Sequence, residues 1–197
     1  MRPVIIIFLL AILVTMMPLG NGLPDDQSPE AVEKWFQKLP QAKHQLTKLH
    51  FYLHLKFTSD PPVSIPVARA NTTAKSPTLF GQVNALDGPL TEQPDSSETI
   101  GYSQGLYSST SQEEISLLVT MSYVFVAGEY NGSTLSVLGR NPVREKYREI
   151  PIVGGSGDFR LARGFCTYST LSEIANPKDE IIEITCFFHR YVISGGD

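Results

Sequence analysis

Apolar and polar residues alternate along most of the chain from residue 48 onward. Between Lys48 and Phe57 the alternation has the period of two that is typical of a strand with one buried face. The run from Ile115 to Ala127 is apolar on both faces, so this strand should be covered on both sides or lie in a barrel wall. From Ile181 to Ile193 the alternation returns, and Cys186 belongs to the face that should point into a core. We expect further strands at residues 65–69, 79–86, 99–107, 134–138, 144–153 and 159–170.

Short turn signals separate these segments. Asp87-Gly88-Pro89 is predicted to close the strand at 79–86, and Asn131-Gly132 is a strong signal for a tight hairpin turn. The glycine-rich stretch from Gly154 to Gly157 is expected to be a flexible turn. Seven or eight strands with short turns and almost no helix predict an all-β barrel or sandwich. A closed barrel of about eight strands is either filled with side chains or holds one small ligand.

The first 22 residues are predicted to be a signal peptide. Arg2 supplies a positive charge before an unbroken apolar run, Val4–Val14, which is too short to span a bilayer comfortably. Gly20-Asn21-Gly22 offers small residues at the spacing that a signal peptidase reads. The alternative is a membrane anchor, and no later segment is apolar and long enough to span a membrane.

A polar leader, residues 23–47, follows the signal peptide. In it, Ser28-Pro29-Glu30 has the pattern of a helix start, with a capping serine and a proline at the first helical position. A short helix that ends near Pro40 and a mobile terminus are the two alternatives. The β-domain is predicted to occupy residues 48–197.

The composition narrows the class of protein. The chain is 42% hydrophobic and 18% charged, with a formal net charge of −4, which excludes a disordered chain. It has no clustered basic face, so we expect neither nucleic acid nor an anionic membrane as a partner. Two glycosylation sequons begin at Asn71 and Asn131, and together with the signal peptide they predict a secreted glycoprotein.

The cysteines and histidines carry little chemistry of their own. Cys166 and Cys186 lie on two predicted strands that a turn near 176–179 would join, so they are either a disulfide or two buried thiols. No Cys/His spacing indicates zinc, and we expect no metal or cofactor. The chain contains neither a phosphate-binding loop nor a nucleophile elbow.

The order of several short segments resembles one family, the plant dirigent proteins. The resemblance runs from about Lys48 to Tyr191 and is specific because the segments occur in family-like order and spacing. The segments are Leu49–His54, Asp87 with Pro89–Thr91, Gln104–Tyr107, Ser111–Glu114, Tyr130–Leu135, Gly139–Val143, Arg148–Pro151, Val153–Gly157 and Ala162–Gly164.

This resemblance implies an eight-stranded antiparallel β-barrel, secretion to the apoplast and a homo-oligomer, either a dimer or a trimer. It also implies a pocket for phenylpropanoid-type ligands. Members of the family that make lignans hold two phenoxy radicals, produced by a separate one-electron oxidase (a laccase or peroxidase), and dictate the face on which they couple. Related members act on quinone methides, including isoflavanol dehydration to pterocarpans. A barrel that only binds phenolics is a third interpretation.

The resemblance also assigns roles to individual residues. Arg148 and Tyr107 are the candidate catalytic residues: Arg148 would stabilise a phenolate or carbonyl oxygen, and Tyr107 would hydrogen-bond or stack on a ligand ring. The candidate substrate-binding residues are Asn141, Asp87, Leu55 and Phe51.

Five of these six candidates also have an alternative role. An exterior salt bridge is the alternative for Arg148, barrel packing for Tyr107, a turn for Asp87, and core packing for Phe51 and Leu55.

The chain departs from the family pattern at two cavity positions. Leu55 stands where the family commonly has a carboxylic acid, and Asn141 stands where lignan-forming members have one. An asparagine hydrogen-bonds a phenol but does not deliver a proton as an acid.

Overall fold

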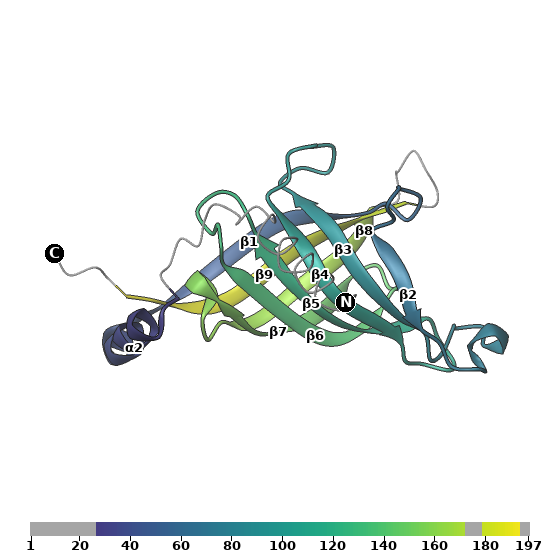
Figure 1. Ribbon diagram of the computed structural model, residues 1–197, viewed down its shortest axis with the longest axis horizontal. Helices are drawn as coiled ribbons and strands as arrows, with labels where there is room; N and C mark the ends of the chain where they lie inside the picture. Colours follow the sequence, from purple (N-terminus) through teal and green to yellow (C-terminus); the bar gives the residue numbers. More distant parts are fainter. Residues whose placement is uncertain (1–26, 172–178, 194–197) are drawn as a thin grey trace, which may run out of the picture.

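The computed structural model describes residues 27–171 and 179–193, which form one antiparallel sheet curled into a barrel (Figure 1). Within these residues the strand order is β1-β9-β8-β7-β6-β5-β4-β3-β2, and pairing of β1 with β3 closes the barrel. Eight strands therefore form the barrel, and β2 pairs only with the outer edge of β3. The predicted eight-stranded antiparallel barrel is confirmed. The strands are β1 (Lys43–Leu55), β2 (Ser64–Ala68), β3 (Val83–Thr91), β4 (Gly101–Ser109), β5 (Ser116–Phe125), β6 (Thr134–Pro142), β7 (Arg148–Ser156), β8 (Arg163–Leu171) and β9 (Glu180–Val192).

A short helix, α2 (Pro29–Lys38), precedes the barrel. The Ser28 hydroxyl accepts a hydrogen bond from the backbone N–H of Ala31 at 3.2 Å, and Pro29 occupies the first turn, where no N–H is needed. The first strand starts at Lys43, five residues before the predicted boundary, and pairs with β9 over its full length. The start of β1 and the end of β9 form a two-stranded arm that extends from the barrel, and α2 lies beyond it (Figure 1). These residues are exposed, so no buried face marks the start of the strand in the sequence.

The predicted turn at Asp87-Gly88-Pro89 is wrong, because these residues lie inside β3 and pair with β4. A Cβ on Gly88 would lie 2.7 Å from a methyl group of Leu53, so this glycine permits the close approach of β1 where the barrel closes. Next to it, His54 Nε2 and Thr91 Oγ1 hydrogen-bond across the same seam at 2.8 Å. The glycine therefore marks the closure of a barrel and not a reversal of the chain.

Two other turn predictions also need correction. Gly154, Gly155 and Ser156 are the end of β7, paired with β6, and the short 3-10 turn η3 (Gly157–Phe159) follows them. A Cβ on Gly155 would lie 2.7 Å from that of Phe159, so this glycine allows close packing and does not supply flexibility. Asn131-Gly132 lies within an eight-residue connection between β5 and β6, where Gly132 has φ +83° and its N–H donates to the Phe125 carbonyl.

Aromatic side chains fill one end of the barrel. Phe159 projects from η3 and packs edge-to-face on Phe125 and Phe188, with ring centroids 5.7 and 5.3 Å apart. Phe51 joins this cluster through Phe125 at 5.9 Å and is 1% exposed. Rings fill the interior at this end, and a hollow lined by Phe51, Phe125 and Tyr130 lies beside them. A second, mainly aliphatic cavity lies toward the opposite end.

The two cysteines are cross-strand neighbours in the core. Cys166 on β8 faces Cys186 on β9, and the structure joins them in a disulfide with both side chains fully buried. The turn that was expected to bring the strands together, near 176–179, lies almost wholly outside the described residues.

Candidate functional site

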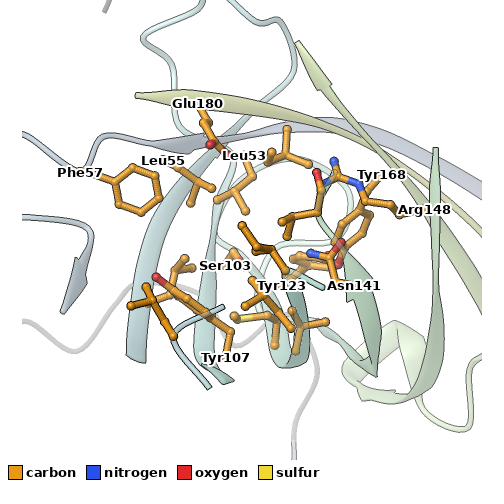
Figure 2. Close-up of a pocket in the computed structure, with 18 residues that line it drawn as sticks. Leu53, Leu55, Phe57, Ser103, Tyr107, Tyr123, Asn141, Arg148, Tyr168 and Glu180 are labelled. Carbon is orange, nitrogen blue, oxygen red and sulfur yellow. The ribbon is translucent and has the colours of Figure 1, made fainter. Parts of the chain in front are cut away.

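A cavity of about 420 Å³ occupies the open end of the barrel (Figure 2). This volume lies within the range of about 300–1,000 Å³ that is usual for small-molecule sites. Exposed Phe57 and Leu79 stand at its rim, so the cavity is reached from solvent. Its walls are mainly aliphatic side chains that point inward from the strands, among them Leu53, Leu86, Leu117, Val119, Met121 and Ile182.

Arg148 is the first residue of β7 and points into this cavity rather than into an exterior salt bridge. It is 5% exposed, and its Nη2 donates a hydrogen bond to Thr170 Oγ1 at 2.8 Å. Its Nε is buried without a hydrogen-bond partner. Burial lowers the pKa of Arg148, while Glu180 and Tyr168 act in the opposite direction, and the guanidinium remains a cation at physiological pH. A buried cation with a free donor is suited to a ligand oxygen.

Asn141 and Ser103 add further unsatisfied polar atoms. The Oδ1 atom of Asn141 and the Oγ atom of Ser103 are buried without a partner, and both residues line the cavity. Among the residues that the structure describes, four buried side-chain atoms lack a partner, and three of them belong to this cavity. Buried polar groups are almost always paired in native proteins, so such a concentration marks a place where a ligand supplies the partners.

Tyr107 and Leu55 also line the cavity. Tyr107 is half-buried on β4, and its hydroxyl hydrogen-bonds Ser64 Oγ on β2 at 2.8 Å, which holds the ring in place at the wall. Leu55 ends β1 and contributes an apolar surface near the rim. The structure thus brings together four of the six predicted site residues: Arg148, Tyr107, Asn141 and Leu55.

The other two lie elsewhere. Phe51 belongs to the aromatic core and packs on Tyr123 at 5.1 Å, so it does not line the cavity. Asp87 is exposed on the outer face of β3, where its carboxylate accepts a hydrogen bond from Gln104 Nε2 at 3.2 Å. The reason is that successive residues of a strand face opposite sides. Leu86 and Gly88 lie on the inner face of β3, so Asp87 between them lies on the outer face.

Two tyrosines that sequence reasoning did not select also line the cavity. Tyr123 on β5 and Tyr168 on β8 are buried, and their hydroxyl groups hydrogen-bond each other. Burial raises the pKa of Tyr168 to about 12 and that of Tyr123 well above its usual value, so both are neutral phenols at physiological pH. Tyr168 is the direct cross-strand neighbour of Arg148. Residues on a strand alternate between its two faces, and Tyr168 lies two residues after Cys166 on β8. Both are buried, so this alternation is the feature of the sequence that indicates an inward side chain for Tyr168.

The remaining predicted sites lie away from the cavity. Asn71 is exposed just before the short turn η2 (Thr73–Lys75), and Asn131 is half-buried in the β5–β6 connection. The predicted signal peptide, residues 1–22, lies outside the described residues. In the part of the chain that the structure describes, the helices are too short and too polar to cross a membrane.

The fold and the site define a closed antiparallel β-barrel with an apolar cavity that is lined by an arginine, an asparagine and a tyrosine pair. A family model described as Dirigent-like protein matches residues 46–189, most of the chain. The chain therefore belongs to the dirigent protein family, as its sequence resemblance predicted.

Similar proteins include members with different names. Pterocarpan synthase 1 of Glycyrrhiza echinata is 44% identical over 151 residues, which cover 76% of this chain and 80% of that protein. Dirigent protein 11 of Arabidopsis thaliana is 44% identical over 144 residues, which cover 73% of this chain and 74% of that protein. The solved structure of a pterocarpan synthase dirigent protein matches with a TM-score of 0.70 and 42% identity, over 77% of this chain and 93% of that one.

Proposed function

We propose that the protein binds phenylpropanoid phenols and imparts stereoselectivity to the coupling of their radicals, for example of coniferyl alcohol to lignans, without an oxidative centre of its own. The observation that carries the proposal is the set of unpaired polar atoms of Arg148, Asn141 and Ser103 in an otherwise apolar cavity. Such a cavity holds a planar aromatic by its faces and fixes its direction by a few hydrogen bonds.

The chemistry of radical coupling suits this cavity. Two phenoxy radicals join without an acid or a base, so the protein need only fix which faces meet. Among the described residues that line the cavity, Glu180 at the rim is the one carboxylate, and Leu55 and Asn141 are neutral. A site with few acids and a fixed arginine is better equipped to orient its ligand than to drive an acid-catalysed elimination.

The proposal includes where and with what the protein works. We propose that it is secreted to the apoplast, where a separate laccase or peroxidase supplies the radicals. We also propose a homo-oligomer, which is supported by large apolar side chains exposed on the outer barrel face, including Leu106, Leu138, Phe165 and Phe187. Light scattering on the purified protein measures the oligomer directly: a dimer or trimer is expected, and a monomer would contradict this part of the proposal.

Chiral chromatography tests the main proposal. Coniferyl alcohol is oxidised by a one-electron oxidase with and without the protein, and the enantiomers of the lignan products are separated. We expect an enantiomeric excess that appears only when the protein is present. A racemic mixture under both conditions would exclude stereodirected coupling of this alcohol, and ligand binding without any product bias would identify a phenolic-binding barrel.

A second candidate function is the dehydration and cyclisation of an isoflavanol through a quinone methide. Two observations favour it: similar proteins named pterocarpan synthase, and the neutral Tyr123–Tyr168 pair beside Arg148. Neutral phenols donate hydrogen bonds to a developing oxyanion, and the arginine stabilises its charge. Turnover of an isoflavanol in the absence of any oxidase is the expected result for this function, and a lack of turnover would exclude it for that substrate.

A further inference from the structure

The carboxylate of the cavity comes from the last strand of the barrel. Glu180 is the first residue of β9 and lies directly opposite Leu55, the last residue of β1 (Figure 2). It shares the inward phase of Ile182 and Ile184 and lines the cavity while remaining exposed to solvent. A glutamate on one strand thus provides an acidic group beside an aliphatic residue on the next.

Among the described residues that line the cavity, Glu180 and Arg148 are the two charged ones. The guanidinium of Arg148 donates to Thr170, whose partner on β9 is Ile182, two residues further along than Glu180. Arg148 is 5% exposed whereas Glu180 is exposed to solvent, so the carboxylate lies at the mouth and the guanidinium lies deeper. Both side chains line the same cavity. The charge of Glu180 raises the pKa of Arg148 against the effect of burial.

This arrangement fits an elongated ligand with an oxygen at each end. The buried guanidinium has a free donor and no acceptor, whereas a carboxylate only accepts hydrogen bonds. The deep end therefore selects an acceptor, such as a phenolic oxygen, and the mouth selects a donor, such as an alcohol. The aliphatic walls between them suit an aromatic ring with a short side chain.

We propose that Glu180 is a specificity-determining residue that accepts a hydrogen bond from the terminal hydroxyl of a phenylpropenyl alcohol whose phenolic oxygen faces Arg148. The inference rests on the proposed function, because it assumes that a phenol of this class is the ligand. It deepens that function by naming the group that distinguishes an alcohol from a ligand without the hydroxyl.

Two matched probes test the inference by isothermal titration calorimetry. Coniferyl alcohol and isoeugenol share the same ring, methoxy group and phenol, and isoeugenol lacks the terminal hydroxyl. We expect the wild-type protein to prefer coniferyl alcohol about tenfold, which corresponds to about 1.4 kcal/mol, because the carboxylate that accepts the hydrogen bond remains exposed to solvent. Glu180→Gln should reduce this preference and Glu180→Leu should abolish it, while the affinity for isoeugenol stays unchanged.

Glu183→Gln is the control variant. Glu183 lies on the same strand but faces outward, where its carboxylate pairs with His50 at 2.9 Å. It should keep the wild-type preference. An equal preference in the wild type and in Glu180→Leu would overturn the inference and leave the proposed function intact. A wild-type protein that binds neither probe would overturn the proposed function, and the inference with it.

Discussion

The hydroxyl groups of Tyr123 and Tyr168 meet inside the barrel, where each is the hydrogen-bond partner of the other. The two residues come from β5 and β8, 45 positions apart in the chain, and both line the cavity. Both tyrosines are buried, so the loss of one hydroxyl leaves the other without its partner. The pair therefore couples the stability of the barrel to the shape of the site.

Removing one hydroxyl should cost more than removing both. Tyr168→Phe is expected to lower the free energy of unfolding by about 1–3 kcal/mol, because the Tyr123 hydroxyl is left buried and unsatisfied. The double variant with phenylalanine at both positions should be close to wild type, since no polar atom is left unpaired. Urea denaturation of the wild type, both single variants and the double variant gives the coupling energy. Additive losses in the double variant would contradict a direct hydrogen bond.

The same pair should make the barrel sensitive to alkali. In the unfolded chain tyrosines titrate near pH 10, whereas burial raises the pKa of Tyr168 to about 12 and also raises that of Tyr123. The native state therefore binds more protons than the unfolded state between these values, and stability is full below pH 10 and falls as the pH rises toward 12. The expected slope is about 1.4 kcal/mol per pH unit for each buried tyrosine. Denaturation from pH 8 to 11.5 measures it, and the double phenylalanine variant should have a smaller slope than the wild type.

Arg148→Ala should abolish the enantiomeric excess in the coupling assay. The substitution removes the buried cation and the free Nε donor from the cavity, so the ligand loses the group that fixes its orientation. Arg140→Ala is the matched control, because Arg140 is exposed outside this cavity and pairs with Glu114. The control variant should retain the wild-type product ratio. A wild-type ratio with Arg148→Ala would disprove the assignment of this cavity as the site.

The disulfide should stabilise the barrel without taking part in its chemistry. Cys166 and Cys186 close a loop of 20 residues, for which the loss of unfolded-state entropy corresponds to about 3 kcal/mol. Replacing both cysteines with alanine should lower the free energy of unfolding by about that amount, and cavities left in the core would add to the loss. Urea denaturation measures the stability and chiral chromatography the product ratio. An unchanged stability would contradict the role of the bond, and a changed product ratio would connect it to the site.

The fold could be predicted from the sequence because strand alternation is a local property. Lys48 to Phe57 and Ile181 to Ile193 alternate with a period of two, and both lie largely in strands with the predicted inward face. The turn predictions were weaker for a physical reason. Gly88 and Gly155 are small because another part of the chain approaches them closely, and composition alone does not distinguish a close approach from a turn.

The site was predictable only in part. The family resemblance selected Arg148, Tyr107, Asn141 and Leu55, and all four line the cavity. Asp87 was assigned on the same grounds, yet the phase of β3 turns it outward. For Tyr168, the sequence indicated only that the side chain points inward. Ordinary core residues have the same pattern, so it did not mark a site residue.

By itself, the sequence determined where most strands lie and which face of each is apolar, because both follow from neighbouring residues on one segment. It did not determine where each strand begins and ends. Only the tertiary structure decided which polar groups share the cavity. Glu180 lies beside Leu55, and Tyr168 beside Arg148, through the register between strands that are distant in the chain. That register depends on closure of the whole barrel, in which each strand must satisfy two neighbours at once, and no single segment encodes it.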